Sequence, residues 1–164
     1  RSFATLSDPD QKEKALDRIK AAAAASQGGK KRPGESFRIQ TQLLDAPSQY
    51  EKGLNYLKTK NFAQASEFFQ YACDIDPARP EYVAHLAWCK FQMAPERLKT
   101  DAQQLFERCM RAKTPSAAAE YLYGKFLAQT GRSKEALAHL KRATALDAKN
   151  PEYVRELRKV EAQP

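Results

Sequence analysis

Small and large apolar residues recur in a fixed order along the second half of the chain, with charged residues between them. Their three- and four-residue spacing predicts amphipathic helices. The small residues let two antiparallel helices approach closely, and the large ones fill the space around them. This pattern predicts helical hairpins, and its first copy reads Gly53, Tyr56, Phe62, Ala65, Phe69, Ala72 and Pro77.

The same order returns near the C-terminus, at Gly124, Gly131, Ala136, Leu140 and Ala143. Here Gly131 is predicted to end the first helix of the pair, and Ser133 to cap the second. Residues 151–162 then place Tyr153, Val154, Leu157 and Val160 on one face and charges on the other. That arrangement predicts a capping helix, which an array of helical repeats needs at its open end.

A degenerate copy lies between these two, at Leu86, Ala87, Ala102, Phe106 and Cys109. The tetrapeptide Pro-Glu-Tyr-Val begins at Pro80 and again at Pro151, so its copies are 71 residues apart. This spacing is three residues more than two periods of about 34 residues. We expect the extra residues in the turn between the helices of the degenerate copy, near residues 93–96.

The first copy resembles the tetratricopeptide repeat, a helix-turn-helix unit. The match comprises Gly53 followed by Tyr56, Ala65 followed by Phe69, and the closing Pro77, although the tryptophan and leucine that open the family pattern are missing. The resemblance implies an all-α fold, a solenoid of about three helical hairpins with a C-terminal cap. It also implies binding of another protein, as a peptide or an amphipathic helix, in a groove lined by the first helix of each pair.

Helical spacing places apolar, aromatic and basic residues on this groove, and tyrosine and tryptophan are frequent anchors for partners. Trp88 and Phe91 suit the core between repeats equally well, so both roles stay open for them. A convex face or the chain's own residues 36–44 are alternative binding surfaces. The predicted partner-binding residues are Tyr50, Leu54, Leu57, Lys58, Trp88, Phe91, Tyr121 and Lys125.

One subclass of this family grips the acidic C-terminus of heat-shock chaperones with Lys, Asn and Arg side chains in the groove. Tyr50 and Leu54 stand at the corresponding positions of the first repeat, and Ala118 and Leu122 at those of the third. Only Lys58 is compatible with that clamp. The sequence therefore predicts that this domain does not bind such tails by the clamp mechanism.

Residues 1–26 are predicted to form a separate unit, in which Leu-Ser-Asp-Pro at residues 6–9 leads into a charged helix over residues 10–25. This segment resembles the end of a J domain, a co-chaperone module. However, Ala15 and Leu16 replace the usual aromatic and acidic residues, and the His-Pro-Asp signature is absent. An unrelated capped helix is the alternative.

Residues 27–46 are predicted to be a linker with a short helix, and residues 47–164 the repeat domain. This pairing resembles bacterial multidomain proteins that join a J-like domain to tetratricopeptide repeats. The predicted function is therefore that of a scaffold or adaptor in a larger bacterial protein. The alternative is a co-chaperone accessory whose repeats present clients or a chaperone to a J domain.

The net charge of +8 is spread along the chain among acidic residues, and the one dense basic cluster, residues 30–32, lies in the predicted linker. We therefore expect no nucleic-acid partner. No apolar run reaches the roughly 18–20 residues that span a bilayer, so we expect no membrane insertion. Cys73, Cys89 and Cys109 form no C-x-x-C pair, which favours a reducing compartment and a cytoplasmic location.

Candidate catalytic chemistry is sparse. The chain has two histidines and no glycine-rich phosphate loop. His85 and Cys89 are one helical turn apart, but the sequence offers no third group to orient them. We expect no enzymatic activity, no cofactor and no metal site. Self-association stays open, because short solenoids can pair through their end helices.

Overall fold

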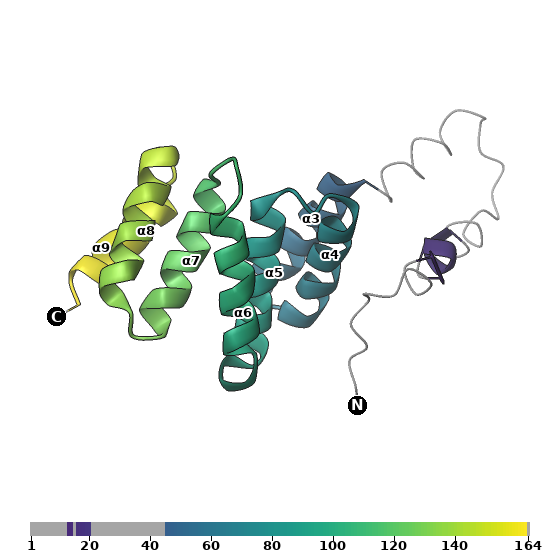
Figure 1. Ribbon diagram of the computed structural model, residues 1–164, viewed down its shortest axis with the longest axis horizontal. Helices are drawn as coiled ribbons and strands as arrows, with labels where there is room; N and C mark the ends of the chain where they lie inside the picture. The colour runs from purple at the N-terminus through teal and green to yellow at the C-terminus, as the bar shows by residue number, and fades with distance from the viewer. Residues whose placement is uncertain (1–12, 15, 21–44, 164) are drawn as a thin grey trace. The chain divides into compact units, whose positions relative to one another are not determined.

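The computed structural model describes residues 13, 14, 16–20 and 45–163. Residues 44–164 form one compact unit, and every regular element described within it is a helix (Figure 1). Residues 13, 14 and 16–20 are helical, within the helix predicted over residues 10–25. The remainder of that prediction and the linker at 27–44 lie outside the described residues. Among the helices described, none combines the length and the apolar character that crossing a membrane requires.

Consecutive helices of this unit pack against each other as hairpins, and the last one closes the array (Figure 1). The predicted all-α solenoid of three hairpins with a C-terminal cap is thus confirmed. Its helices are α3 (Ala46–Lys58), α4 (Phe62–Ile75), α5 (Pro80–Met93), α6 (Pro95–Met110), α7 (Ala117–Gln129), α8 (Ser133–Leu146) and α9 (Pro151–Glu161).

Side-chain caps fix the start of several helices, because each satisfies a first-turn N–H that lacks an intrahelical partner. The side chains of Asp45, Asn61, Ser116 and Asn150 accept such bonds at the starts of α3, α4, α7 and α9. The predicted cap of α8 was wrong by one residue. Ser133 is the first helical residue, and Arg132 stands at the cap position without a side-chain cap bond.

Small and large residues interlock between the two helices of a hairpin, as their order in the sequence predicts. A Cβ atom added to Gly53 of α3 would lie 2.6 Å from Cε1 of Phe69 in α4. At Gly124 of α7 it would lie 2.7 Å from Cγ of Leu140 in α8. Both large side chains are fully buried. The glycines thus let each ring or branched side chain lie directly on the backbone of the facing helix.

The second repeat departs from the period, but not where the sequence suggested. α3, α5, α7 and α9 begin at residues 46, 80, 117 and 151, so the spacings are 34, 37 and 34 residues. Only Ala94 separates α5 from α6, whereas three residues join the helices of the other two hairpins. The predicted long turn near residues 93–96 was wrong. Pro95 starts α6 directly, because its fixed φ and missing N–H suit the first helical position.

The additional length lies later in the repeat. α6 has 16 residues against 14 in α4 and α8, and residues 111–116 form a longer connection than those before α5 and α9. Besides its hairpin partner α8, α7 packs on α5 of the preceding repeat and makes few contacts with α6. α5 is accordingly buried on nearly all sides, with ten of its 14 residues in the core. The α5–α7 pair is therefore the centre of the unit.

Candidate functional site

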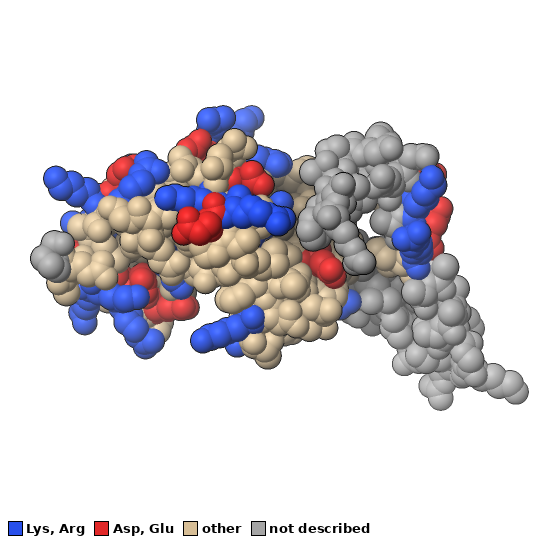
Figure 2. Space-filling model, turned by 90° about the horizontal axis from the view of Figure 1, so that it is seen from below, with Lys and Arg blue, Asp and Glu red and all other residues tan. Residues whose placement is uncertain are grey.

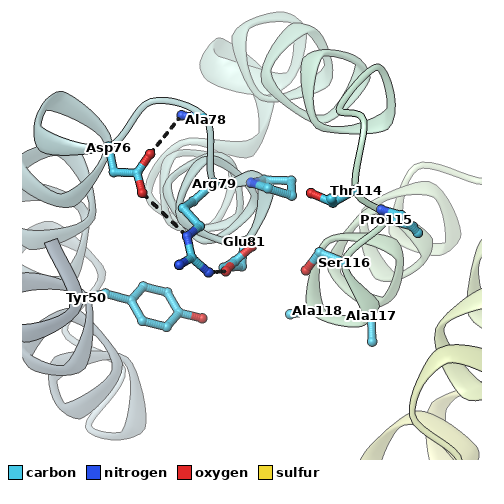
Figure 3. Close-up of a pocket in the computed structure, with 11 residues that line it drawn as sticks. Tyr50, Asp76, Ala78, Arg79, Glu81, Thr114, Pro115, Ser116, Ala117 and Ala118 are labelled. Carbon is cyan, nitrogen blue, oxygen red and sulfur yellow. Dashed lines mark hydrogen bonds and ion pairs between the residues drawn. The ribbon is translucent and has the colours of Figure 1, made fainter.

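A hollow of about 750 Å³ opens where the N-terminal ends of α5 and α7 face Tyr50 of α3 (Figure 3). One wall is formed by Asp76 and residues 78–81, which connect α4 to α5 and begin α5. The opposite wall is formed by residues 114–118, which end the long connection and begin α7. The hollow therefore joins all three repeats of the array.

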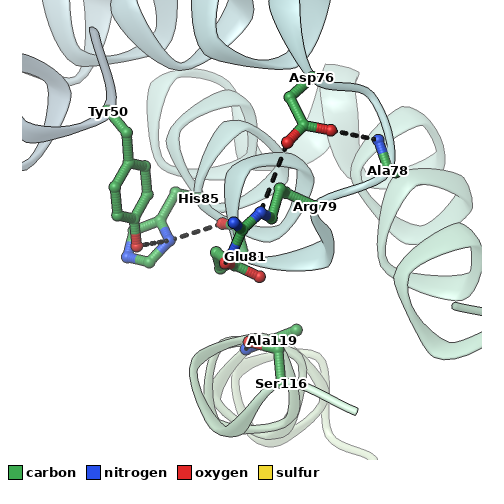
Figure 4. A network of polar contacts seen from close by, with 8 residues as sticks. All are labelled: Tyr50, Asp76, Ala78, Arg79, Glu81, His85, Ser116 and Ala119. Atoms are coloured by element: carbon green, nitrogen blue, oxygen red, sulfur yellow. Dashed lines mark hydrogen bonds and ion pairs between the residues drawn. The ribbon is translucent and has the colours of Figure 1, made fainter. Parts of the chain in front are cut away.

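Arg79 organises the first wall of the hollow (Figure 4). Its guanidinium lies 3.4 Å from Oδ2 of Asp76 and 3.4 Å from Oε1 of Glu81. The other oxygen of Asp76 accepts a bond from the backbone N–H of Ala78 at 3.3 Å. Exposed ion pairs contribute little to stability, and these contacts place the guanidinium between the two carboxylates of this rim.

Tyr50 and His85 bridge α3 and α5 beneath the hollow (Figure 4). Nδ1 of His85 lies 2.8 Å from the carbonyl oxygen of Glu81 and 3.2 Å from Oη of Tyr50. Burial lowers the pKa of His85 to about 4, so the ring is neutral at pH 7. Because a carbonyl oxygen only accepts, Nδ1 carries the proton and donates it.

The tautomer of His85 decides what Tyr50 can do. With Nδ1 donating, the Tyr50 hydroxyl is an acceptor in this contact and its own proton is not used there. Burial raises the pKa of Tyr50, so the hydroxyl keeps that proton. Tyr50 lines the hollow and points toward it from the α3 side (Figure 3). It can therefore donate a hydrogen bond to a group that enters the hollow.

The α7 wall adds further donors. The Oγ of Ser116 accepts from the N–H of Ala119 at 3.4 Å and so caps the helix. The preceding N–H groups of Ala117 and Ala118 belong to the first turn, where no intrahelical acceptor exists. Among the described residues, no group of three metal-ligating side chains stands close enough to hold an ion. The hollow suits a polar chain that offers carbonyl oxygens.

The predicted groove residues of the first repeat lie on one face of α3. Tyr50, Leu54 and Leu57 are half-buried and pack against the core. Lys58 is exposed, and its ammonium lies 3.5 Å from Oδ1 of Asn55. Of these four residues, only Tyr50 reaches the hollow. A partner-binding role for the other three stays a prediction.

The predicted groove residues of the second and third repeats come together between α5 and α7. Phe91 is buried, and its ring lies 4.9 Å from that of Phe126, as the core alternative expects. Trp88 is only 7% exposed, and Nζ of Lys125 lies 4.6 Å from the centroid of its ring. The same ammonium lies 5.2 Å from the ring centroid of Tyr121. Trp88, Tyr121 and Lys125 thus form one cluster.

Most residues of the hollow were not predicted from the sequence. The predicted set contained Tyr50 but missed Asp76, Arg79, Glu81 and the residues of the α6–α7 connection. Two signals were available, namely the proline that starts α5 and the serine that caps α7. Neither signal says that the two connections face each other, because helical periodicity carries no information on loop geometry.

Charged side chains are spread over the array. On the face seen in Figure 2, Lys and Arg side chains occur along the array with Asp and Glu between them. Ion pairs join several of the described charged side chains, such as Arg132 with Glu135 and Lys159 with Glu156. The face shown has no continuous basic patch of the kind that tracks a phosphate backbone.

Comparison with known proteins identifies the repeats. Sequence models of the tetratricopeptide repeat match residues 46–79 and 100–159. No curated protein sequence matches the chain closely enough to count as a relative. Neither family match reaches residues 1–45, so the J-domain resemblance gains no support, and most of that segment lies outside the described residues.

Several solved structures share the fold. The Arabidopsis OM64 TPR domain has 20% identity and a TM-score of 0.57, over 73% of this chain and 96% of that chain. The first TPR of Spaghetti (RPAP3), bound to the HSP90 peptide SRMEEVD, has 22% identity and a TM-score of 0.56, over 71% and 90%. The Yersinia enterocolitica type III secretion translocator chaperone SycD has 19% identity and a TM-score of 0.55, over 82% and 96%.

Proposed function

Because this chain carries tetratricopeptide repeats over residues 46–79 and 100–159, we propose that it is a non-catalytic adaptor that binds an extended segment of a partner protein. The observation that carries the proposal is the hollow between the N-terminal ends of α5 and α7. Its volume falls in the range of about 300–1,000 Å³ that is usual for ligand sites. In this proposal the partner's main chain occupies the hollow.

The polar groups of the hollow suit a main chain. The Tyr50 hydroxyl and the first-turn N–H groups of α7 are donors for carbonyl oxygens. The carboxylates of Asp76 and Glu81 are held by Arg79 and keep lone pairs that accept from peptide N–H groups. An extended segment offers both kinds of group along its length, as it does when it pairs with a sheet edge.

The line of binding continues along the α5–α7 pair. Glu81 and Trp88 are seven residues apart on α5, and Ala118 and Lys125 are seven apart on α7. Seven residues are about two helical turns, so each pair shares a face over about 10 Å. An extended peptide covers that distance with about three residues. A segment that leaves the hollow in this direction meets the cluster of Trp88, Tyr121 and Lys125.

The bound HSP90 peptide in the Spaghetti structure supports peptide binding as a use of this fold. At 22% identity it does not carry the partner over to this chain. Tyr50 and Leu54 stand where the chaperone-tail clamp needs Lys and Asn, so we propose a partner other than such a tail. No observation favours the co-chaperone alternative. The division into residues 1–26, 27–46 and 47–164 and the cytoplasmic location stay predictions.

The test uses a displayed library of random peptides selected on the full chain. Ala118→Arg places a long side chain in the hollow without removing a core group, since Ala118 is half-buried at the start of α7. Ala138→Arg makes the same change at an exposed position of α8. Selected peptides are expected to lose binding to Ala118→Arg and keep it for Ala138→Arg, with circular dichroism confirming the helices. Equal binding to both variants contradicts the proposal.

A further inference from the structure

Lys125 and Trp88 form a second polar site that the hollow does not use. We propose that this pair binds the side-chain carboxylate of an aspartate or glutamate in the extended partner segment. This inference deepens the proposed function and rests on it. The structure supports it through two hydrogen-bond donors that lie together at the α5–α7 interface and have no acceptor there.

Lys125 is the first donor. Its Nζ lies over the rings of Trp88 and Tyr121, at 4.6 and 5.2 Å from their centroids. None of the ion pairs within residues 45–163 involves Lys125. The Tyr121 hydroxyl donates a hydrogen bond to Oε1 of Glu152 at 3.0 Å. Ring faces attract a cation but accept no full hydrogen bond from it, so the ammonium keeps its donors.

Trp88 is the second donor. The residue is 7% exposed, yet no hydrogen bond in the described part of the chain involves its indole N–H. In that same part, no fully buried side-chain nitrogen or oxygen lacks a partner. The indole nitrogen must therefore reach the surface, where an incoming acceptor can meet it. A buried indole normally finds such an acceptor.

A carboxylate matches these two donors. It has two oxygens that accept, so one oxygen can accept a hydrogen bond from the ammonium and the other from the indole N–H. The surrounding aromatic rings exclude water from one side, which strengthens a charge-assisted bond. One turn further, Gln92 and Gln129 bond each other at 3.2 Å and leave the flank uncharged. The site therefore has one cation without an ion-pair partner among the described residues, and it suits one acid.

The geometry favours an internal acidic residue over a chain terminus. The site lies about two helical turns from the hollow, along the same faces of α5 and α7. A segment that fills the hollow passes the site in mid-course, so a side chain and not the terminal carboxylate is presented there. Among selected peptides we expect an Asp or Glu about three residues from the residue seated in the hollow.

Trp88 is the only tryptophan of the chain, so its fluorescence reports directly on the site. The experiment titrates the full chain with one selected acidic peptide and with the same peptide carrying Gln for Glu or Asn for Asp. Loss of the charge is expected to weaken binding about 10- to 100-fold and to reduce the fluorescence change. With Lys125→Gln the two peptides are expected to bind equally, since the charged donor is gone.

Two variants serve as controls. Lys99→Gln removes the same charge from an exposed position of α6 and should leave the preference for acid unchanged. Lys125→Arg keeps the charge and should retain most of the preference for the acidic peptide. Peptides that depend on Ala118 but show no acid preference, or a preference that survives Lys125→Gln, overturn the inference and leave the proposed function standing. If no selected peptide depends on Ala118, the proposed function itself fails.

Discussion

Lys60 and Gly131 occupy the same position in the first and third repeats. Each is the second residue after the first helix of its hairpin, and each has a positive φ, 57° and 84°. The backbone bonds that close the two turns also correspond, since in each case the residue's own N–H reaches back three residues and the next N–H reaches back five. This is the Schellman ending of a helix, in which glycine is the usual residue.

Lys60→Gly is therefore expected to raise the free energy of unfolding by about 0.5–1 kcal/mol, because a left-handed conformation is strained for any residue with a Cβ atom. Gly131→Ala should lower it by about 1 kcal/mol. A Cβ atom at Gly131 meets nothing within 4 Å, so that change tests the backbone alone. Urea denaturation measures both variants. A Lys60→Gly protein less stable than the parent would contradict the argument.

Gly53→Ala is expected to destabilise the first hairpin by about 1–3 kcal/mol through overpacking. The new methyl group would lie 2.6 Å from the ring of Phe69, which is fully buried and cannot move freely. Phe69→Leu removes the clashing ring atoms. The double variant should therefore lose less free energy of unfolding than the two single variants lose together, as measured by denaturant unfolding. Strict additivity would show that the glycine is not needed for the close approach.

The stability of the domain should depend on pH through His85. The pKa of this residue is about 4 in the folded chain because the ring is buried, against an ordinary value near 6.5. Below pH 6.5 the unfolded chain binds a proton that the folded chain does not, so stability falls as the pH is lowered toward 4. The loss approaches about 3 kcal/mol.

The comparison that isolates His85 is the His85→Gln variant, unfolded by urea at several values between pH 7 and pH 4. Carboxylates titrate in both proteins, so their contribution cancels in the difference between the two curves. The parent should lose stability more steeply than His85→Gln as the pH falls. Parallel curves would mean that His85 accepts its proton in the folded state.

The chaperone-tail peptide SRMEEVD, bound in the Spaghetti structure, should not bind this chain in the low micromolar range. Tyr50 and Leu54, neither of which carries a charge or an amide, stand where the clamp requires Lys and Asn. Calorimetric titration measures the affinity, and the same peptide with an amidated C-terminus is the control. A low micromolar dissociation constant that is lost on amidation would show that a terminal carboxylate is bound after all.

The parts of the fold that could be predicted are those that close packing dictates. Gly53 under Phe69 and Gly124 under Leu140 are positions where only a small residue opposite a large one allows two helices to touch, so they are visible in the sequence. The end of α7 could also be predicted from the sequence, because the left-handed conformation at Gly131, two residues after the helix, favours glycine. The start of α8 was misplaced by one residue because serine is a favoured capping residue, whereas Arg132 stands at the cap position without a side-chain cap bond.

The geometry of the loops, and which loops and side chains face each other, could not be predicted. Pro95 was interpreted as part of a long turn, although proline is equally favourable in the first turn of a helix. Trp88 and Phe91 are three residues apart, so helical spacing places both on the same face of α5. Only the structure shows that Phe91 packs on Phe126, whereas the ammonium of Lys125 lies over the ring of Trp88. The hollow depends on where two connections meet, which no periodic pattern encodes.

The longer second repeat has a consequence for how a partner is aligned. Its additional residues include part of the connection 111–116, and the end of that connection forms one wall of the hollow. In an array of identical hairpins, the connections between successive repeats would face each other in the same way everywhere. A bound strand could then shift by one repeat without a loss of binding free energy. Here the connection 111–116 is longer than the others, so a strand that recognises the hollow beside it can bind in a single register.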